Sequence, residues 1–255
     1  MSKLVEISLL VKGSVEIEAD GSVIASRLDE KEKLPAGVVK LVDQAIAGWK
    51  FEPVQVEGRA VKVRAPMSLR VVAKEIGDEF TVRISGVDFG TDRPEEFVTA
   101  KGRLARPPYP AEAVWKGVGG TVYLVMQIGR DGKPMQIVAE QVNLTSVDNK
   151  RNMEKWRALL AEASTEIARR WRFNPPTKGS LVDAPYWTAR VPVDFVRPNQ
   201  PEPKYGQWYA YIPGPRQEIP WLPAEDRSTS ADTLVAGGVY PLGTGPRLLT
   251  PPSGS

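Results

Sequence analysis

The sequence predicts an α+β protein made of two small antiparallel sheets, each packed on one main helix, with an extended tail rich in proline and aromatic residues. Three observations predict this class. Several stretches alternate apolar and polar residues, which is typical of strands with one buried face. Two longer stretches place apolar residues at helical spacing. After each predicted helix the chain reads Trp-x-Phe-x-Pro, first at Trp49, Phe51 and Pro53 and again at Trp171, Phe173 and Pro175.

The repeated segment divides the 255 residues into two units of ordinary domain size. We expect a first domain over residues 1–89, a linker over 90–104, a second domain over 105–197 and a tail over 198–255. The same arrangement of strands and helix is therefore predicted twice in one chain.

The first repeat begins with a long alternating strand and a hairpin. Asp20 and Gly21 both tolerate positive φ, so they predict a tight turn. Pro35 suits the first turn of a helix, and Pro53 prevents that helix from continuing. The expected elements are a strand over 5–19, a strand over 22–28, a helix over 35–49, a strand over 61–73 and a short strand over 80–84 that pairs back on it.

The second repeat has the same order after a proline-rich opening. Asp131 and Gly132 again predict a hairpin turn, and Pro175 with Pro176 stops the main helix. The expected elements are a short helix over 111–116, strands over 121–129 and 133–140, a helix ending at 171 and a strand over 187–195. From Pro198 onward no apolar period survives, so we expect an extended or disordered tail with a free end over 250–255.

Composition excludes several classes of function. The chain has 34 basic and 31 acidic residues, a balance that gives little basis for nucleic-acid binding. It has neither cysteine nor histidine, which excludes disulfides, the usual zinc sites and nucleophile–imidazole catalysis. We therefore expect no enzyme, no cofactor and no metal site. No run approaches the ~20 apolar residues of a membrane span, and the first ten residues do not form a secretory signal.

The second repeat resembles the TonB C-terminal domain family over about residues 105–197. The resemblance rests on motifs that occur in that family's order. These are Pro108, Tyr109, Pro110 and Ala113, then Gly120, Thr121 and Val122, then Asp131 and Gly132, and finally Trp171, Phe173 and Pro175. The first repeat keeps Asp20, Gly21, Trp49, Phe51, Pro53 and Gly58 but lacks the Pro-Tyr-Pro opening.

This resemblance implies a periplasmic protein, from which a signal has been removed, that binds other proteins rather than catalysing a reaction. The founding member of the family adds a strand of an outer-membrane receptor to its own sheet edge. The resemblance thus implies a protein partner, either an outer-membrane receptor or another envelope protein. The alternative is a structural or scaffold protein of the cell envelope that self-associates through its tail.

The last strand of each repeat is where strand addition would occur. Both strands contain a proline, Pro66 and Pro192, which favours an edge position. The strand over 80–84 would cover the first edge, which leaves the second edge to a partner or to the chain's own tail. The candidate partner-binding residues are Tyr186, Thr188, Ala189, Arg190, Val191, Val193 and Phe195. The expected structural residues are Trp49, Phe51, Pro53, Tyr109, Pro110, Gly120, Gly132, Trp171, Phe173 and Pro175.

Overall fold

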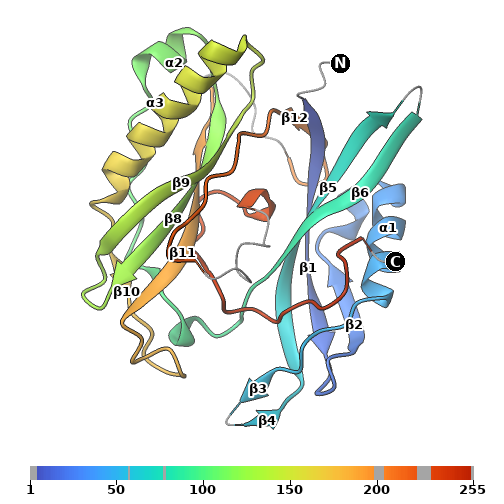
Figure 1. Cartoon of the computed structure of the whole chain (residues 1–255). Coiled ribbons are helices and arrows are strands. Elements are labelled where there is room, and N and C mark those ends of the chain that lie inside the picture. Colours follow the sequence, from blue (N-terminus) through green and yellow to red (C-terminus); the bar gives the residue numbers. More distant parts are fainter. Residues whose placement is uncertain (1–4, 57, 77–78, 198–203, 223–230, 254–255) are drawn as a thin grey trace. The chain divides into compact units, whose positions relative to one another are not determined.

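The computed structural model describes residues 5–56, 58–76, 79–197, 204–222 and 231–253. In these ranges the protein is mixed α/β, with several small antiparallel sheets and three α-helices (Figure 1). A predicted turn at Gly77 and Asp78 lies outside the described residues, as do the tail residues 198–203, 223–230 and 254–255. Within the described ranges, no helix combines the length and the apolar character that a membrane crossing requires.

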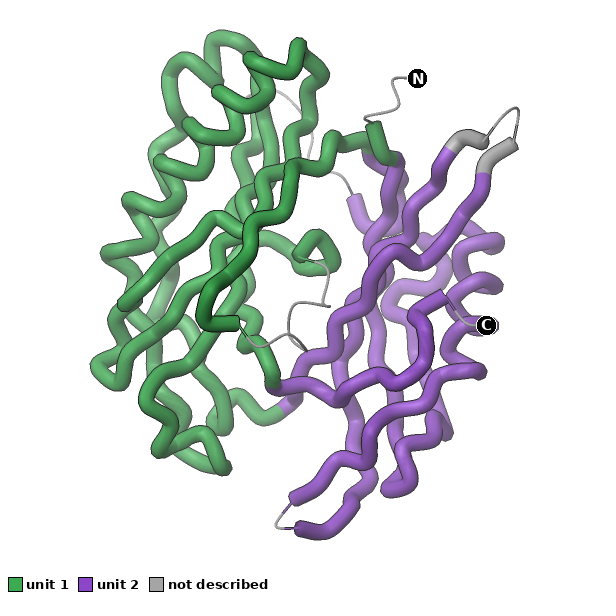
Figure 2. The backbone as a smooth tube through the Cα atoms, in the orientation of Figure 1, with its two compact units in different colours: residues 1–6, 93–202, 210–243 green, residues 7–92, 203–209, 244–255 purple. Residues whose placement is uncertain are grey.

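The chain divides into two compact units, one for each predicted repeat (Figure 2). Unit 2 holds the first repeat, and unit 1 holds the second. The sequence predicted a separate linker and a separate tail, but residues from both belong to the units. Unit 1 consists of residues 1–6, 93–202 and 210–243, and unit 2 consists of residues 7–92, 203–209 and 244–255.

Unit 2 has a sheet in the order β2-β1-β5-β6. Helix α1 follows Pro35 and buries one apolar face, formed by Val38, Val42, Ala45 and Ile46, in the core of this unit. The elements are β1 (Glu6–Ile17), β2 (Val23–Leu28), η1 (Lys31–Lys33), α1 (Ala36–Ala47), β3 (Gln55–Val56), β4 (Arg59–Ala60), β5 (Val63–Ile76) and β6 (Glu79–Phe89).

Unit 1 has a sheet in the order β13-β11-β8-β9, and helix α3 covers one face of it (Figure 1). The side chain of Asn149 caps α3 by accepting the N–H of Asn152 at 2.9 Å. The elements are η2 (Pro94–Glu96), β7 (Thr99–Ala100), α2 (Ala111–Trp115), β8 (Gly120–Gly129), β9 (Pro134–Leu144), α3 (Lys150–Ala168), β10 (Phe173–Asn174), β11 (Tyr186–Phe195), β12 (Tyr209–Tyr211), η4 (Ala231–Thr233) and β13 (Tyr240–Pro241).

The predicted repeat is present in the structure, down to its turns. Gly21 and Gly132 adopt positive φ, 83° and 72°, at the tips of the two hairpins. In both turns the preceding aspartate accepts a backbone N–H two residues further on, at 2.9 Å and 3.0 Å. Strands β1, β2 and β5 around α1 correspond to β8, β9 and β11 around α3.

Several predicted boundaries were wrong. Strand β9 runs on to Leu144 rather than ending at Glu140, because it stays paired with β8 as far as Leu144, which lies opposite Gly120. Leu144 also exchanges two backbone hydrogen bonds with Ile212 of the tail. Strand β6 spans 11 residues rather than five, and it pairs with β5 from Met67 to Ile76. Pro66 does not mark an edge, since β5 lies between β1 and β6. The predicted linker includes β7, which pairs with β10.

The tail is not a separate extended segment in its described parts. It supplies buried side chains, and it does so without an apolar period. The buried tail residues include Tyr211, Ile212, Ile219, Leu222 and Leu234. Its end is not free up to Ser253, whose hydroxyl donates to the carbonyl of Ile84 at 3.0 Å.

Candidate partner-binding edge

Strand β11 is paired with β8 over its whole length and carries a strict division of faces. Its odd-numbered side chains point into the core beneath α3. That buried set consists of Trp187, Ala189, Val191, Val193 and Phe195. The even-numbered side chains lie on the other face of the sheet.

The backbone edge of β11 away from β8 is occupied by the chain's own tail. The N–H of Leu242 donates to the carbonyl of Thr188 at 2.9 Å, and the N–H of Gly237 donates to the carbonyl of Pro192 at 3.3 Å. Between these bonds β13 pairs antiparallel with β11, with Arg190 opposite Tyr240. The even-numbered residues of β11 therefore direct their backbone groups toward the tail.

Both prolines at this contact sit where a missing N–H costs little. Pro192 offers its carbonyl to the tail and needs no donor on that side. Pro241 is one residue from Leu242, which carries the donating N–H, so its own nitrogen points away from β11. The edge thus accepts an extended segment that itself contains proline.

The predicted partner-binding residues fall into two groups. Ala189, Val191, Val193 and Phe195 are core residues, and Arg190 is fully buried. Tyr186 is 36% exposed and Thr188 is half-buried. A partner at this edge would therefore meet mainly backbone groups and these two side chains, and the contact of the seven residues with a partner stays a prediction.

A buried ion cluster, which the sequence analysis did not predict, lies on the sheet face opposite α3. Glu140 on β9 accepts two hydrogen bonds from Arg190, with Nε–Oε2 at 2.6 Å and Nη2–Oε1 at 3.0 Å. Arg216 of the tail adds a third, Nε–Oε1 at 2.8 Å. The Glu140 and Arg190 side chains are 1% and 0% exposed, whereas that of Arg216 is 37% exposed.

This cluster fixes the tail to the sheet beside the candidate edge. One carboxylate serves two guanidinium groups, and such buried pairing orients side chains because an unpaired buried charge is costly. The neighbouring residue Gln217 donates its N–H to the carbonyl of Glu140 at 2.7 Å. The alternation of β11 placed Arg190 on its polar face, but the tail residue Arg216 carried no pattern that would pair it with Glu140.

The residues of the two Trp-x-Phe-x-Pro segments lie against the two hairpin turns, at Gly21 and at Gly132. Trp49, Phe51, Trp171 and Phe173 are all at most 4% exposed, as expected for rings that fix a helix end to a sheet. Their proline partners differ, since Pro53 is exposed and Pro175 is half-buried.

Tyr109 packs against the end of β11 that lies farthest from the β8–β9 hairpin turn. Its hydroxyl donates to the carbonyl of Val118 at 2.7 Å, and its ring lies edge-on to Phe195 with centroids 5.3 Å apart. Burial raises the pKa of the Tyr109 phenol, an effect that the charge of Arg197 opposes. Pro110 directly precedes α2, and Gly120 lies so close to β9 that an added Cβ would stand 2.2 Å from the carbonyl oxygen of Asn143.

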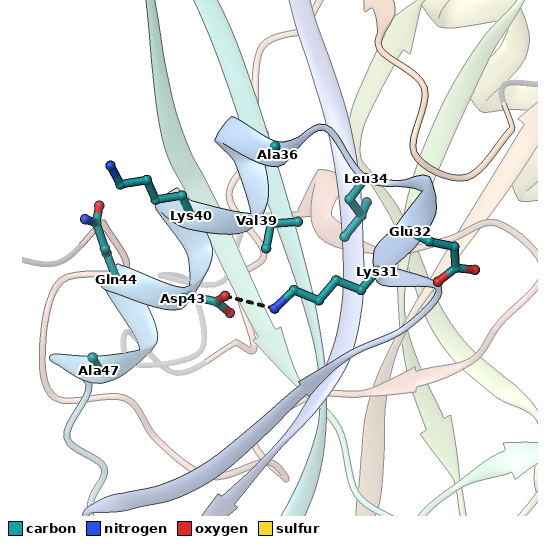
Figure 3. Close-up of a pocket in the computed structure, with 9 residues that line it drawn as sticks. All are labelled: Lys31, Glu32, Leu34, Ala36, Val39, Lys40, Asp43, Gln44 and Ala47. Carbon is teal, nitrogen blue, oxygen red and sulfur yellow. Dashed lines mark hydrogen bonds and ion pairs between the residues drawn. The ribbon is translucent and has the colours of Figure 1, made fainter.

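An open hollow lies beside α1 in unit 2 (Figure 3). Lys31 and Asp43 form an ion pair of 3.1 Å across it, and both side chains are exposed. Its lining mixes charged and small apolar side chains: Lys31, Glu32, Leu34, Ala36, Val39, Lys40, Asp43, Gln44 and Ala47. Such a solvated surface contains no nucleophile paired with a base.

Metal binding and similarity to known proteins add no further assignment. Among the described residues, no cluster of three or more acidic side chains has the spacing to hold a metal ion. No protein-family model matches the chain, and no curated protein and no solved structure shows a significant match to it. The resemblance to the TonB C-terminal domain family therefore rests on the motif residues described above.

Proposed function

We propose that this chain is a non-enzymatic, TonB-like protein-binding module of the periplasm that holds an extended peptide at the β11 edge. The partner would be an outer-membrane receptor or another envelope protein. One observation carries the proposal: Tyr240 and Pro241 of the tail already pair with this edge, and the N–H groups of Gly237 and Leu242 on either side donate to carbonyls of β11. Strand addition uses the same backbone groups for affinity and the flanking side chains for selectivity.

The resident segment is suited to exchange. Only Ala189 and Arg190 of β11 are in register with β13, so a partner strand would have few ladder bonds to replace. Each backbone hydrogen bond contributes about 0.5–1.5 kcal/mol net. A partner segment that also pairs with Tyr186 and Asp194, at the two ends of β11, would form a longer ladder than the tail does.

The non-enzymatic and periplasmic parts of the proposal have separate support. A chain without histidine or cysteine lacks the side chains most used for proton transfer and nucleophilic attack near neutral pH. The periplasmic placement follows from the family resemblance. The residues that carry it, including Tyr109, Gly132, Trp171 and Phe173, form the hairpin and helix ends of unit 1.

A binding experiment with a synthetic peptide of residues 235–243 tests the proposal. In the wild-type chain the tethered tail competes at an effective concentration in the millimolar range, so we expect weak binding of the labelled peptide by fluorescence anisotropy. Leu242→Pro removes the N–H that bonds Thr188 and should improve binding about tenfold, the equivalent of one hydrogen bond. Leu242→Ala keeps that N–H and serves as the matched control.

Adding Thr188→Pro to the Leu242→Pro chain should abolish the gain, because Thr188 directs its backbone toward the tail, and a proline ring at its nitrogen would occupy the space of the docked strand. Thr188→Ala in the same background should keep it. Equal binding by the Thr188→Pro and Thr188→Ala chains would contradict strand addition at this edge. Competition by segments of outer-membrane receptors then identifies the class of partner.

A further inference from the structure

We propose that unit 2 carries a second peptide-binding site, formed by residues Trp49–Glu52, that holds an extended proline-containing segment by its backbone. We call these residues the acceptor segment. Residues 245–253, at the end of the same chain, fill the site in this structure and are called the strap. The proposal is independent of the β11 edge, since every residue in it belongs to unit 2.

The strap is held by a short antiparallel ladder. The N–H of Glu52 donates to the carbonyl of Arg247 at 2.9 Å, and the N–H of Leu249 donates to the carbonyl of Lys50 at 2.8 Å. Between them Phe51 lies opposite Leu248. These contacts involve backbone atoms and so place little demand on the sequence of the occupant.

Two further hydrogen bonds hold Thr250 and Pro252, near the end of the strap. The N–H of Lys50 donates to the hydroxyl of Thr250 at 3.2 Å, and the indole N–H of Trp49 donates to the carbonyl of Pro252 at 3.2 Å. Gly245 fits at the start of the strap, where an added Cβ would stand 1.8 Å from the carbonyl oxygen of Phe89.

Unit 1 repeats this recognition with a different occupant. There the N–H of Lys101 donates to the carbonyl of Arg172 at 2.9 Å, Phe173 lies opposite Ala100, and the indole of Trp171 donates to Ala105 at 2.9 Å. The occupant precedes the second repeat in the sequence, whereas the strap follows everything else. Two unrelated segments bound in the same way indicate that a Trp-x-Phe segment is a general acceptor of extended chain.

The chemistry of the ligand follows from these contacts. It is an extended segment with a leucine at the place of Leu248, whose side chain packs on the core of unit 2, a hydroxyl two residues later and then Pro-Pro. Leu249 contributes its N–H but little packing, because its side chain is 60% exposed. The ion pair between Arg247 and Glu52, at 3.6 Å with both side chains exposed, adds little.

Cutting the full chain between the two units tests the proposal. A protease site inserted between Gly243 and Thr244 falls at the unit boundary, beside an exposed glycine with φ 73°. After cleavage only the acceptor segment and its surroundings hold the strap. We expect the released strap to co-elute with the protein and to exchange with a labelled peptide of residues 244–255, followed by fluorescence anisotropy.

Two altered peptides test whether the N–H of Leu249 contributes to binding. The Leu249→Pro peptide lacks the N–H that bonds Lys50, so we expect it to bind about tenfold more weakly. The Leu249→Ala peptide keeps that N–H and should bind nearly as well as the original. The uncut chain should bind the labelled peptide far more weakly than the cut chain. Loss of the strap on cutting with no binding of added peptide, or equal binding of the two altered peptides, would overturn the proposal.

Discussion

The N–H of Phe173 donates to the carbonyl of Gly132 at 2.9 Å, which joins the end of the main helix to the tip of the hairpin. Phe51 makes the same bond to Gly21 at 2.8 Å. The turn glycine is therefore pressed against the Trp-x-Phe-x-Pro segment in both repeats. This contact explains why the hairpin turn and that segment occur together in the sequence.

Gly132→Ala should destabilise unit 1 strongly. The glycine has φ 72°, and an added Cβ would stand 2.2 Å from the carbonyl oxygen of Phe173. The left-handed conformation alone costs an alanine about 1–2 kcal/mol, and the clash adds to it. Gly58→Ala is the matched control, because its φ is 75° but no atom lies within 4 Å of its added Cβ. Equal losses in urea unfolding of the two variants would show that the contact with Phe173 is unimportant.

Glu140→Gln should cost about 3–5 kcal/mol of unfolding free energy, as expected when one partner of a buried ion pair is removed. The substitution removes the carboxylate charge that pairs with the buried Arg190 guanidinium. Glu112→Gln serves as the control, because its pair with Lys155 is half exposed at both side chains and should be worth less than about 1 kcal/mol.

The combined change of Glu140→Met with Arg190→Met should recover most of the stability lost in Glu140→Gln, since it replaces both members of the buried ion pair with apolar side chains. Arg216 is partly exposed and can turn its charge to water. Urea unfolding of the variants measures the recovery. A double variant less stable than Glu140→Gln would show that the pair stabilises the fold outright.

Stability should fall at alkaline pH through Tyr205. Its hydroxyl accepts the N–H of Lys12 at 3.1 Å and donates to the carbonyl of Asp29 at 3.0 Å, where β1 and β2 separate. Burial raises the pKa of this phenol above its ordinary value of 10.0, an effect that the Lys12 hydrogen bond opposes and nearby acidic residues reinforce. The contribution is fully present below the unfolded pKa and is lost as pH rises through the folded pKa.

Tyr205→Phe removes this titration along with the hydroxyl. We expect the variant to be less stable than the wild type at pH 8 but to lose less stability between about pH 8 and 11, because its side chain cannot ionise. Urea midpoints at the two pH values provide the comparison. A larger alkaline loss in Tyr205→Phe than in the wild type would exclude Tyr205 as a source of the pH dependence.

The sequence predicted local features better than those that depend on distant chain segments. The turns at Gly21 and Gly132 and the rings of Trp49 and Trp171 could be predicted because turn chemistry and helical period are local signals. The Arg216–Glu140 contact could not, since it joins a tail without period to a strand 76 residues earlier. Single-residue docking of this kind leaves no pattern in the sequence.

The candidate edge was predicted correctly as a strand, and its role in binding a partner stays a prediction. Alternation placed Val191 and Val193 on one face of β11, and the structure puts that face in the core. Whether a partner or the tail covered the edge was left open by the sequence, because β13 has only two residues and Pro241 is one of them. Backbone pairing of so short a segment depends on tertiary context rather than on propensity.

Native-state hydrogen exchange by NMR, with and without a saturating peptide of residues 235–243, tests the central claim most directly. We predict that the amide of Leu242 is protected in the free chain and loses protection when the peptide binds, while the amide of Val191, which faces β8, stays protected. A bound peptide that leaves Leu242 protected would contradict the claim that the β11 edge is the site for extended segments.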